Sequence, residues 1–476
     1  MTDPRAEPRR AEPEHAVQPI ADPTSTLRAA IDAARARADA AGRPVVLVHV
    51  VPRDDVDPLA ELREARVGDY GVFWAEPGDA FAVAGLGPLV TIETSGPERF
   101  ERAGARAIEV LADAVIVRDA AAPPWSPRWF GGFAFGDEAS RDPVWAGFAA
   151  AEFVLHRRVV GRLHGDGFEQ RACLVEPGAD AAIVAMDLDS PAVLPHSEPR
   201  RDPPPAHDGR TRFTEGVRRA VAAIEGGGLE KVVLVRSETR TTATAVAPVD
   251  VLERLGATQP ACVRFGFGAG GAAFVGATPE WLVRTRGATV QTMALAGSAP
   301  RGADDAEDRA QMVALTSSRK EAGEHRIVVD AVLDALRPLC ERVEVARGPA
   351  VMTLANIHHL KTGIAGRARP GTTGVALARA LHPTPAVGGR PRDAAATFID
   401  ANESDDRGWF AGAVGWIDIH GDVDLAVALR SAVIDRTSVT TFAGAGIVAA
   451  SDPDRELAET DTKMDAMRKA IEGADA

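Results

Sequence analysis

The sequence predicts an α+β fold, in which helices and strands are intermixed without a regular strand–helix–strand repeat. Short segments rich in aromatic and β-branched residues recur at 71–94, 127–135 and 153–160, as expected for strands. Longer segments with helical character stand among the later strands, at 212–225 and in a long helical region at 304–339. Because no strict alternation emerges, this class is favoured over a doubly wound parallel sheet.

The chain divides by composition into a tail and two halves. Residues 1–24 mix Pro, Ala, Arg and Glu and are expected to be disordered. A first helix at 25–41 and a buried strand at 45–51 open a strand-rich N-terminal half that extends to residue 205. A connector rich in proline and charge, 196–210, leads into residues 206–476, where the residues that could do chemistry are concentrated.

Composition excludes several classes of protein. The 476 residues are 45% hydrophobic and 26% charged, which is ordinary for a soluble globular protein. A net charge of −14 argues against nucleic acid or an anionic membrane surface as the main partner. The longest uncharged stretches, such as 265–279, are too short to span a bilayer, and no signal peptide is visible. Three widely spaced cysteines are expected to be reduced thiols, so a cytoplasmic protein is expected.

A glycine-rich stretch near the C-terminus is predicted to join a strand to a helix. The strand is expected at 438–442, a glycine turn at Gly444 and Gly446, and a helix beginning after Asp452, a good N-cap. Gly444, Gly446 and Ala449 imitate a dinucleotide-binding fingerprint. That interpretation fails, because no further strand with an acidic residue follows to bind a ribose.

Two helices each carry a Glu-x-x-Glu pair. Glu456 and Glu459 share one face of the C-terminal helix with Lys463, and Glu321 and Glu324 have the same spacing in the long helical region. Carboxylates from two helices could bind a hard cation, and Mg²⁺ suits such a site best. The alternatives are solvated helix faces and a di-iron site. The di-iron site requires Glu-x-x-His, whereas the histidine here directly follows the second glutamate.

Lys231 and Glu280 are the candidates for acid–base chemistry. Lys231 begins the otherwise apolar strand 231–236, and Glu280 follows a glycine-rich pair of strands. A lysine at a strand end ordinarily reaches water, and to act as a base it needs a lowered pKa. The pattern alone leaves both interpretations open for each residue.

Six motifs, in this order and spacing, resemble the chorismate-utilising enzymes over residues 213–467. They are VGATPEWLVR, MALAGSAPRG, KEAGEHRIVVD, HPTPAVGG, GWFAGAVGW and GAGIVAASDPDRELAETDTK. GVFWAEP and PRWFGGFAF are similar to the first half of isochorismate synthases. The resemblance implies a single large domain of two packed β-sheets with helices outside.

The resemblance also implies a role for each candidate residue. Lys231 matches the general base that activates water for attack at C2 of chorismate, and Glu280 matches the general acid for the departing C4 hydroxyl. The implied metal site holds Mg²⁺ through Glu324 and Glu459, with Glu321 and Glu456 acting through water. The implied substrate-binding residues are Gly297, Ser298, His359, Ala386, Arg430, Gly446 and Lys463.

Positions at which members of the family differ in sequence indicate which of the family's reactions to expect. Ala296 stands where aminodeoxychorismate-forming members have a nucleophilic lysine, and Lys231 stands where ammonia-adding members have glutamine. Ala386 and Phe410 lack the polar groups of lyase-competent relatives. The sequence therefore predicts a monomeric isochorismate synthase, serving menaquinone or siderophore biosynthesis. The alternatives are a salicylate synthase that also eliminates pyruvate and a silent chorismate-binding subunit, and the intact Lys231 and Glu280 argue against the latter.

Overall fold

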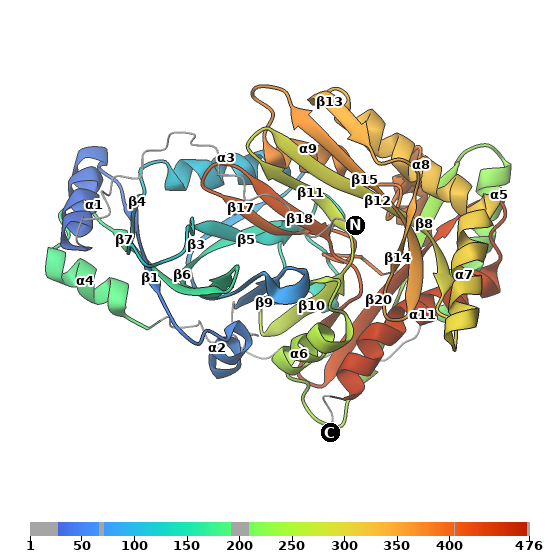
Figure 1. Ribbon diagram of the computed structural model, residues 1–476, viewed down its shortest axis with the longest axis horizontal. Coiled ribbons are helices and arrows are strands. Elements are labelled where there is room, and N and C mark those ends of the chain that lie inside the picture. Colours follow the sequence, from blue (N-terminus) through green and yellow to red (C-terminus); the bar gives the residue numbers. More distant parts are fainter. Residues whose placement is uncertain (1–26, 66–70, 192–208, 404, 474–476) are drawn as a thin grey trace, which may run out of the picture.

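The computed structural model describes residues 27–65, 71–191, 209–403 and 405–473 (Figure 1). The predicted disordered tail at 1–24 and most of the predicted connector at 196–210 lie outside these residues. Within them the chain forms eleven α-helices and twenty strands. The helices are α1 (Leu27–Ala41), α2 (Pro58–Ala65), α3 (Arg99–Leu111), α4 (Ala181–Asp189), α5 (Arg210–Glu225), α6 (Pro248–Thr258), α7 (Asp305–Ser317), α8 (Arg319–Leu336), α9 (Gly374–Leu381), α10 (Arg392–Asn402) and α11 (Pro453–Glu472). The strands are β1 (Val45–Pro52), β2 (Val72–Ala75), β3 (Phe81–Thr94), β4 (Val115–Arg118), β5 (Arg128–Phe133), β6 (Ala151–Leu163), β7 (Asp166–Val175), β8 (Lys231–Thr241), β9 (Val263–Ala269), β10 (Ala272–Thr278), β11 (Trp281–Arg286), β12 (Thr289–Pro300), β13 (Cys340–Val345), β14 (Ala350–Thr353), β15 (Ile357–Ala368), β16 (Gly389–Arg390), β17 (Ala413–Asp418), β18 (Val423–Val427), β19 (Ser431–Asp435) and β20 (Ser438–Ile447).

Two branches of mainly antiparallel strands diverge from β6. One edge of β6 pairs with β3, and this branch continues through β2, β9, β10, β19 and β20 to β8 and β16. The other edge pairs with β5 and β7. The β5 branch continues through β17, β18, β11 and β12 to β15, which also pairs with β13 and β14. The two sheets are thus joined at one strand rather than formed by separate domains.

The main hydrophobic core lies between these two branches. Phe265 and Phe274 from β9 and β10 are buried in the same cluster as Trp416 and Leu425 from β17 and β18. Helices lie on the outside, with α1 and α4 at one end and α5, α7, α8 and α11 at the other (Figure 1). The predicted α+β class with two packed sheets is confirmed. None of the helices in the described residues is long and apolar enough to cross a membrane.

Most predicted elements appear within a few residues of their expected bounds, but two predictions are wrong. The long helical region at 304–339 is two helices, because Ser318 interrupts it and its side chain caps α8 by accepting a hydrogen bond from Glu321 N (3.3 Å). The expected glycine turn at Gly444 and Gly446 is strand, since β20 pairs with β8 as far as Ile447. The glycines there permit close approach of side chains rather than a change of direction.

Candidate active site

Lys231, the first residue of β8, lies inside the protein, just before the segment of β8 that pairs with β20. Its side chain is 0% exposed, and its Nζ lies 2.9 Å from Glu324 Oε1 on α8. A Cβ atom at Gly446, on the neighbouring strand, would come within 2.8 Å of Lys231 Cε and would collide with the Glu324 carboxylate. Glycine at 446 is therefore required for this ion pair. The interpretation of Lys231 as a strand-end lysine reaching water is wrong, and among the described residues its ammonium has no directed hydrogen-bond partner.

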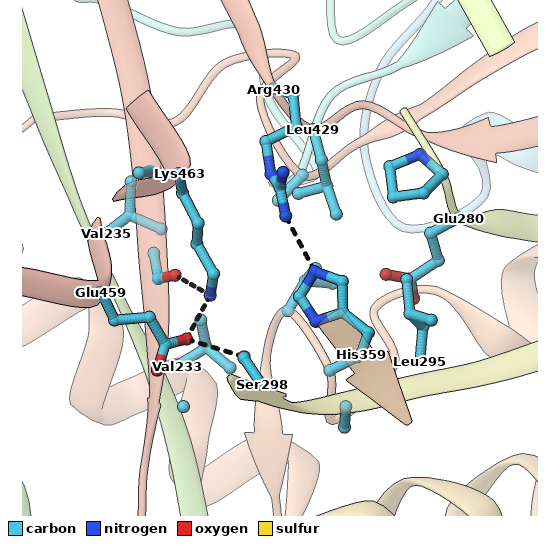
Figure 2. A pocket seen from close by; sticks show the side chains of 18 of the residues that line it. Val233, Val235, Glu280, Leu295, Ser298, His359, Leu429, Arg430, Glu459 and Lys463 are labelled. Atoms are coloured by element: carbon cyan, nitrogen blue, oxygen red, sulfur yellow. Dashed lines mark hydrogen bonds and ion pairs between the residues drawn. The ribbon is translucent and has the colours of Figure 1, made fainter. Parts of the chain in front are cut away.

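One pocket gathers ten of the thirteen predicted site residues, and the other three border it. Lys231, Glu321 and Glu456 are the three that do not line the pocket directly. Figure 2 shows the ionisable groups of Arg430, Lys463, Glu280 and Glu459 around a common space. The predicted residues that line the pocket are Glu280, Gly297, Ser298, Glu324, His359, Ala386, Arg430, Gly446, Glu459 and Lys463.

Arg430 is aimed into the pocket by a neutral histidine. Arg430 has a left-handed backbone (φ 49°) and donates a hydrogen bond to His359 Nε2 over 2.9 Å (Figure 2). His359 must therefore carry its proton on Nδ1, from which it donates to Gly297 O (3.3 Å). Burial, and then the charges of Arg430 and Lys463, lower the pKa of His359 to about 3. The imidazole stays neutral at all physiological pH values and leaves the other N–H groups of Arg430 for an anion.

Glu280 is held as a neutral acid. Its backbone is fixed by two hydrogen bonds, N–H to Thr278 Oγ1 (3.2 Å) and C=O from Val427 N (2.9 Å). Burial raises the pKa of its carboxyl to about 8, although Lys231, Lys463 and Arg430 act in the opposite direction. Near neutral pH the carboxyl is therefore mostly protonated and can donate a proton.

The two Glu-x-x-Glu pairs, on α8 and α11, are close enough for the charges of Glu321 and Glu459 to interact. Burial raises the pKa of Glu321, and the neighbouring Glu324 raises it further. Burial likewise raises the pKa of Glu456, with a further contribution from Glu459. Repulsion between these groups makes the cluster a place where added positive charge is favourable, so the interpretation as freely solvated helix faces is not supported.

A β-bulge connects the two glutamate helices. The pairing of β12 with β15 shifts register between Leu295 and Ser298, and Gly297 within the bulge has a φ of 82°. The bulge directs Ser298 N–H at Glu321 Oε2 (3.0 Å) and the Ser298 hydroxyl at Glu459 Oε1 (3.2 Å). A single residue of the sheet therefore fixes one carboxylate from each helix.

Two lysines pair with carboxylates of this cluster. Lys463 Nζ lies 2.6 Å from Glu459 Oε1 and donates to Gly444 O at 2.8 Å (Figure 2). Burial favours the neutral form of Glu459, but Lys463 outweighs this effect and lowers its pKa. Lys320 Nζ lies 3.0 Å from Glu456 Oε1. Our sequence analysis missed Lys320, although it directly precedes the first Glu-x-x-Glu pair.

The donor set is compatible with Mg²⁺ but does not form a ready cage. Within the described residues, no three His, Cys, Asp or Glu side chains converge as a group of metal ligands. Mg²⁺ characteristically takes one or two carboxylates and completes its coordination with water and substrate oxygens. Glu324 and Glu459, which both line the pocket, could supply such a pair.

The apolar walls of the pocket also escaped our sequence analysis. Val233 and Val235 line it, and they lie on the same face of β8 as Lys231 because side chains alternate along a strand. Leu295 and Leu429 also belong to the apolar lining (Figure 2). The alternation of side chains along the strand, counted from Lys231, could have predicted that these valines lie on the same face as the lysine.

The chain is similar to known proteins over most of its length. A family model described as chorismate binding enzyme matches residues 31–472. The chain is 35% identical over 469 residues to the salicylate biosynthesis isochorismate synthase of Pseudomonas aeruginosa, covering 95% of this chain and 96% of that relative. It is 30% identical over 437 residues to isochorismate synthase MenF of Bacillus subtilis, covering 88% and 92%. The solved structure of MenF, the menaquinone-specific isochorismate synthase from Escherichia coli, superposes with a TM-score of 0.73 at 26% identity, covering 90% and 95%.

The raised pKa of Glu280 predicts a pH-dependent stability. Its carboxyl holds its proton up to about pH 8 in the folded protein but releases it near 4.5 in the unfolded chain. The folded state binds more protons at this group between these values, so the contribution of Glu280 to the free energy of unfolding should fall as pH rises from about 4.5 to about 8. Glu280→Gln removes this contribution, and its Tm relative to wild type should rise over that interval. Thermal unfolding across the range measures this, and a Tm difference independent of pH would contradict it.

Proposed function

The chain belongs to the chorismate binding enzyme family, and on that premise we propose that it is an isochorismate synthase. Two full-length relatives carry that activity in their names. The observation that carries the proposal is a pocket lined by a neutral carboxyl, Glu280, and by the cations Arg430 and Lys463. A buried amine, Lys231, lies beside this pocket, 2.9 Å from the lining residue Glu324. A base, an acid and two anion-binding cations are what the conversion of a dicarboxylate by exchange of a hydroxyl requires.

We assign the proton transfers to Lys231 and Glu280. Lys231 acts in its neutral amine form, after its ammonium has given up a proton, and takes a proton from water as the water oxygen bonds to C2 of chorismate. The ring double bonds shift, the C4–O bond breaks, and Glu280 protonates the departing oxygen so that it leaves as water. The pKa of Glu280, about 8, supports its role as the acid at neutral pH. The enolpyruvyl group is unchanged.

Binding of the two substrate carboxylates falls to cations in this acidic protein. Arg430, oriented by His359, and Lys463 are the protein groups that would bind them. Glu324 and Glu459 would hold Mg²⁺, with Glu321 and Glu456 acting through water. When bound, Mg²⁺ supplies positive charge that neutralises the glutamates and a substrate carboxylate.

The first prediction of this proposal concerns the product. Purified protein with chorismate and Mg²⁺ at neutral pH should give a mixture of chorismate and isochorismate, reached from either compound. Ala386 and Phe410 contribute no polar group to the pocket that could stabilise the loss of pyruvate. Coupling to lactate dehydrogenase and NADH should therefore reveal little pyruvate beyond spontaneous decay. Stoichiometric pyruvate with salicylate fluorescence would instead identify a salicylate synthase.

The second prediction concerns the base. Lys231→Ala should lower kcat by at least about 100-fold, the lower range for loss of a general base, while substrate binding is largely retained. Lys469→Ala, at an exposed position of α11, is the matched control and should leave turnover unchanged. Near-normal turnover by a folded Lys231→Ala protein would rule out this role.

The third prediction concerns the metal. Calorimetric titration should detect Mg²⁺ binding to the wild type, weakened at least about tenfold in Glu324→Ala and in Glu459→Ala. Glu456→Ala should weaken binding less, because that residue is assigned to the metal only through water. Wild-type protein that binds no Mg²⁺ and remains fully active in EDTA would remove the metal from the mechanism.

A further inference from the structure

The edge of β8 that faces away from β20 is completed by side chains. β16 pairs with this edge only at Lys231 and Val232. Beyond that point Val233 O accepts a hydrogen bond from Arg407 Nη2 (2.8 Å), and Val235 N–H donates to Glu403 Oε1 (2.8 Å). A guanidinium and a carboxylate therefore occupy the place of the next strand, next to the proposed base.

Arg407 and Glu403 form a buried bidentate ion pair. Arg407 donates to Glu403 through Nε (2.7 Å) and Nη2 (2.5 Å), and the two side chains are only 2% and 8% exposed. The remaining amino group, Nη1, donates to Val387 O (2.7 Å), and the guanidinium lies 4.2 Å from the centre of the Phe135 ring. Every nitrogen of this guanidinium is thus committed.

The ion pair of Arg407 and Glu403 contacts several segments that line the pocket. Val233, Val235 and Val387, whose backbone groups it contacts, all line the pocket. The carbonyl of Arg407 accepts from the backbone N–H of Phe410 (2.8 Å), another lining residue. The catalytic strand, the loop after α9 and the turn before β17 therefore meet at one ion pair.

We propose that Arg407 and Glu403 are positioning residues for the reaction, which set the place of β8, and with it Lys231, relative to the opposite pocket wall. This inference rests on the proposed function. A buried ion pair is an inefficient way to stabilise a fold, because desolvation offsets its attraction. Its directed hydrogen bonds instead fix geometry, and a displacement of about 1 Å at a reacting group can cost about 100-fold in rate.

The test compares Arg407→Lys and Glu403→Gln with a matched control, Arg264→Lys. A lysine at 407 keeps the charge but cannot reach both carbonyls and the carboxylate. Arg264 is likewise buried, pairs with Asp79 and donates to a backbone carbonyl, that of Leu252 (3.1 Å), but it does not line the pocket. We expect both variants at the ion pair to lower kcat at least about tenfold with KM changed less than about threefold, and Arg264→Lys to keep kcat within about twofold.

Hydrogen exchange separates this inference from the proposed function. The amide of Val235 should exchange faster in Arg407→Lys than in the wild type and in Arg264→Lys, whether or not chorismate is the substrate. If wild-type protein does not convert chorismate, the proposed function fails and exchange alone decides the inference. Unchanged exchange, unchanged kcat in folded variants, or an equal loss of kcat in Arg264→Lys would overturn it. Failure of both variants to fold would also overturn it, because the pair would then be a requirement of the fold.

Discussion

The ion pair between Lys231 and Glu324 is the constraint on which the rest of the site depends. Lys231 is removed from water completely, and removing an ion from water costs several kcal/mol unless a partner compensates. The partner, Glu324, belongs to α8, a helix outside the sheet. The ion pair therefore requires a fixed spacing and a fixed register between β8 and α8. Gly446 makes the contact possible, and the bulge at Ser298 ties α8 and α11 to the same sheet. The strand pairing of the core therefore determines the electrostatics of the pocket.

Balanced charge explains why the pocket can hold several ionised groups in a protein of net charge −14. Glu324 and Glu459 are each paired with a lysine, and Lys320 pairs with Glu456. Glu280 is different, because burial outweighs the nearby cations and keeps it neutral. Glu280 and Glu459, two carboxyl groups of one pocket, thus differ in protonation because their surroundings differ. This difference allows a proton donor and an anion to coexist in the pocket.

Local patterns in the sequence were sufficient for most elements, whereas the set of site residues came from the resemblance to a family. The Asp452 cap, the apolar strand from Lys231 and the two Glu-x-x-Glu pairs depend on neighbours within a few residues, so the chain could be interpreted there without its tertiary structure. The break at Ser318 and the extension of β20 through Gly446 were missed. The break at Ser318 comes from a local cap on Glu321 N, so the serine itself was the available signal. The extension of β20 depends on its pairing with β8, which is distant in sequence, and a glycine-rich segment is equally compatible with a turn and with close packing. The complete burial of Lys231 could not be predicted for the same reason.

Several departures from regular backbone geometry lie at the pocket. Regular pairing of β12 with β15 is interrupted by the bulge at Gly297, and the left-handed backbones of Ala411 and Arg430 lie in its lining. The edge of β8 is completed by Arg407 and Glu403 instead of a strand. Each departure has a cost in local backbone or solvation energy, and each directs a polar group to a fixed position. Because these departures are stabilised by packing between residues distant in sequence, a local sequence pattern does not predict them.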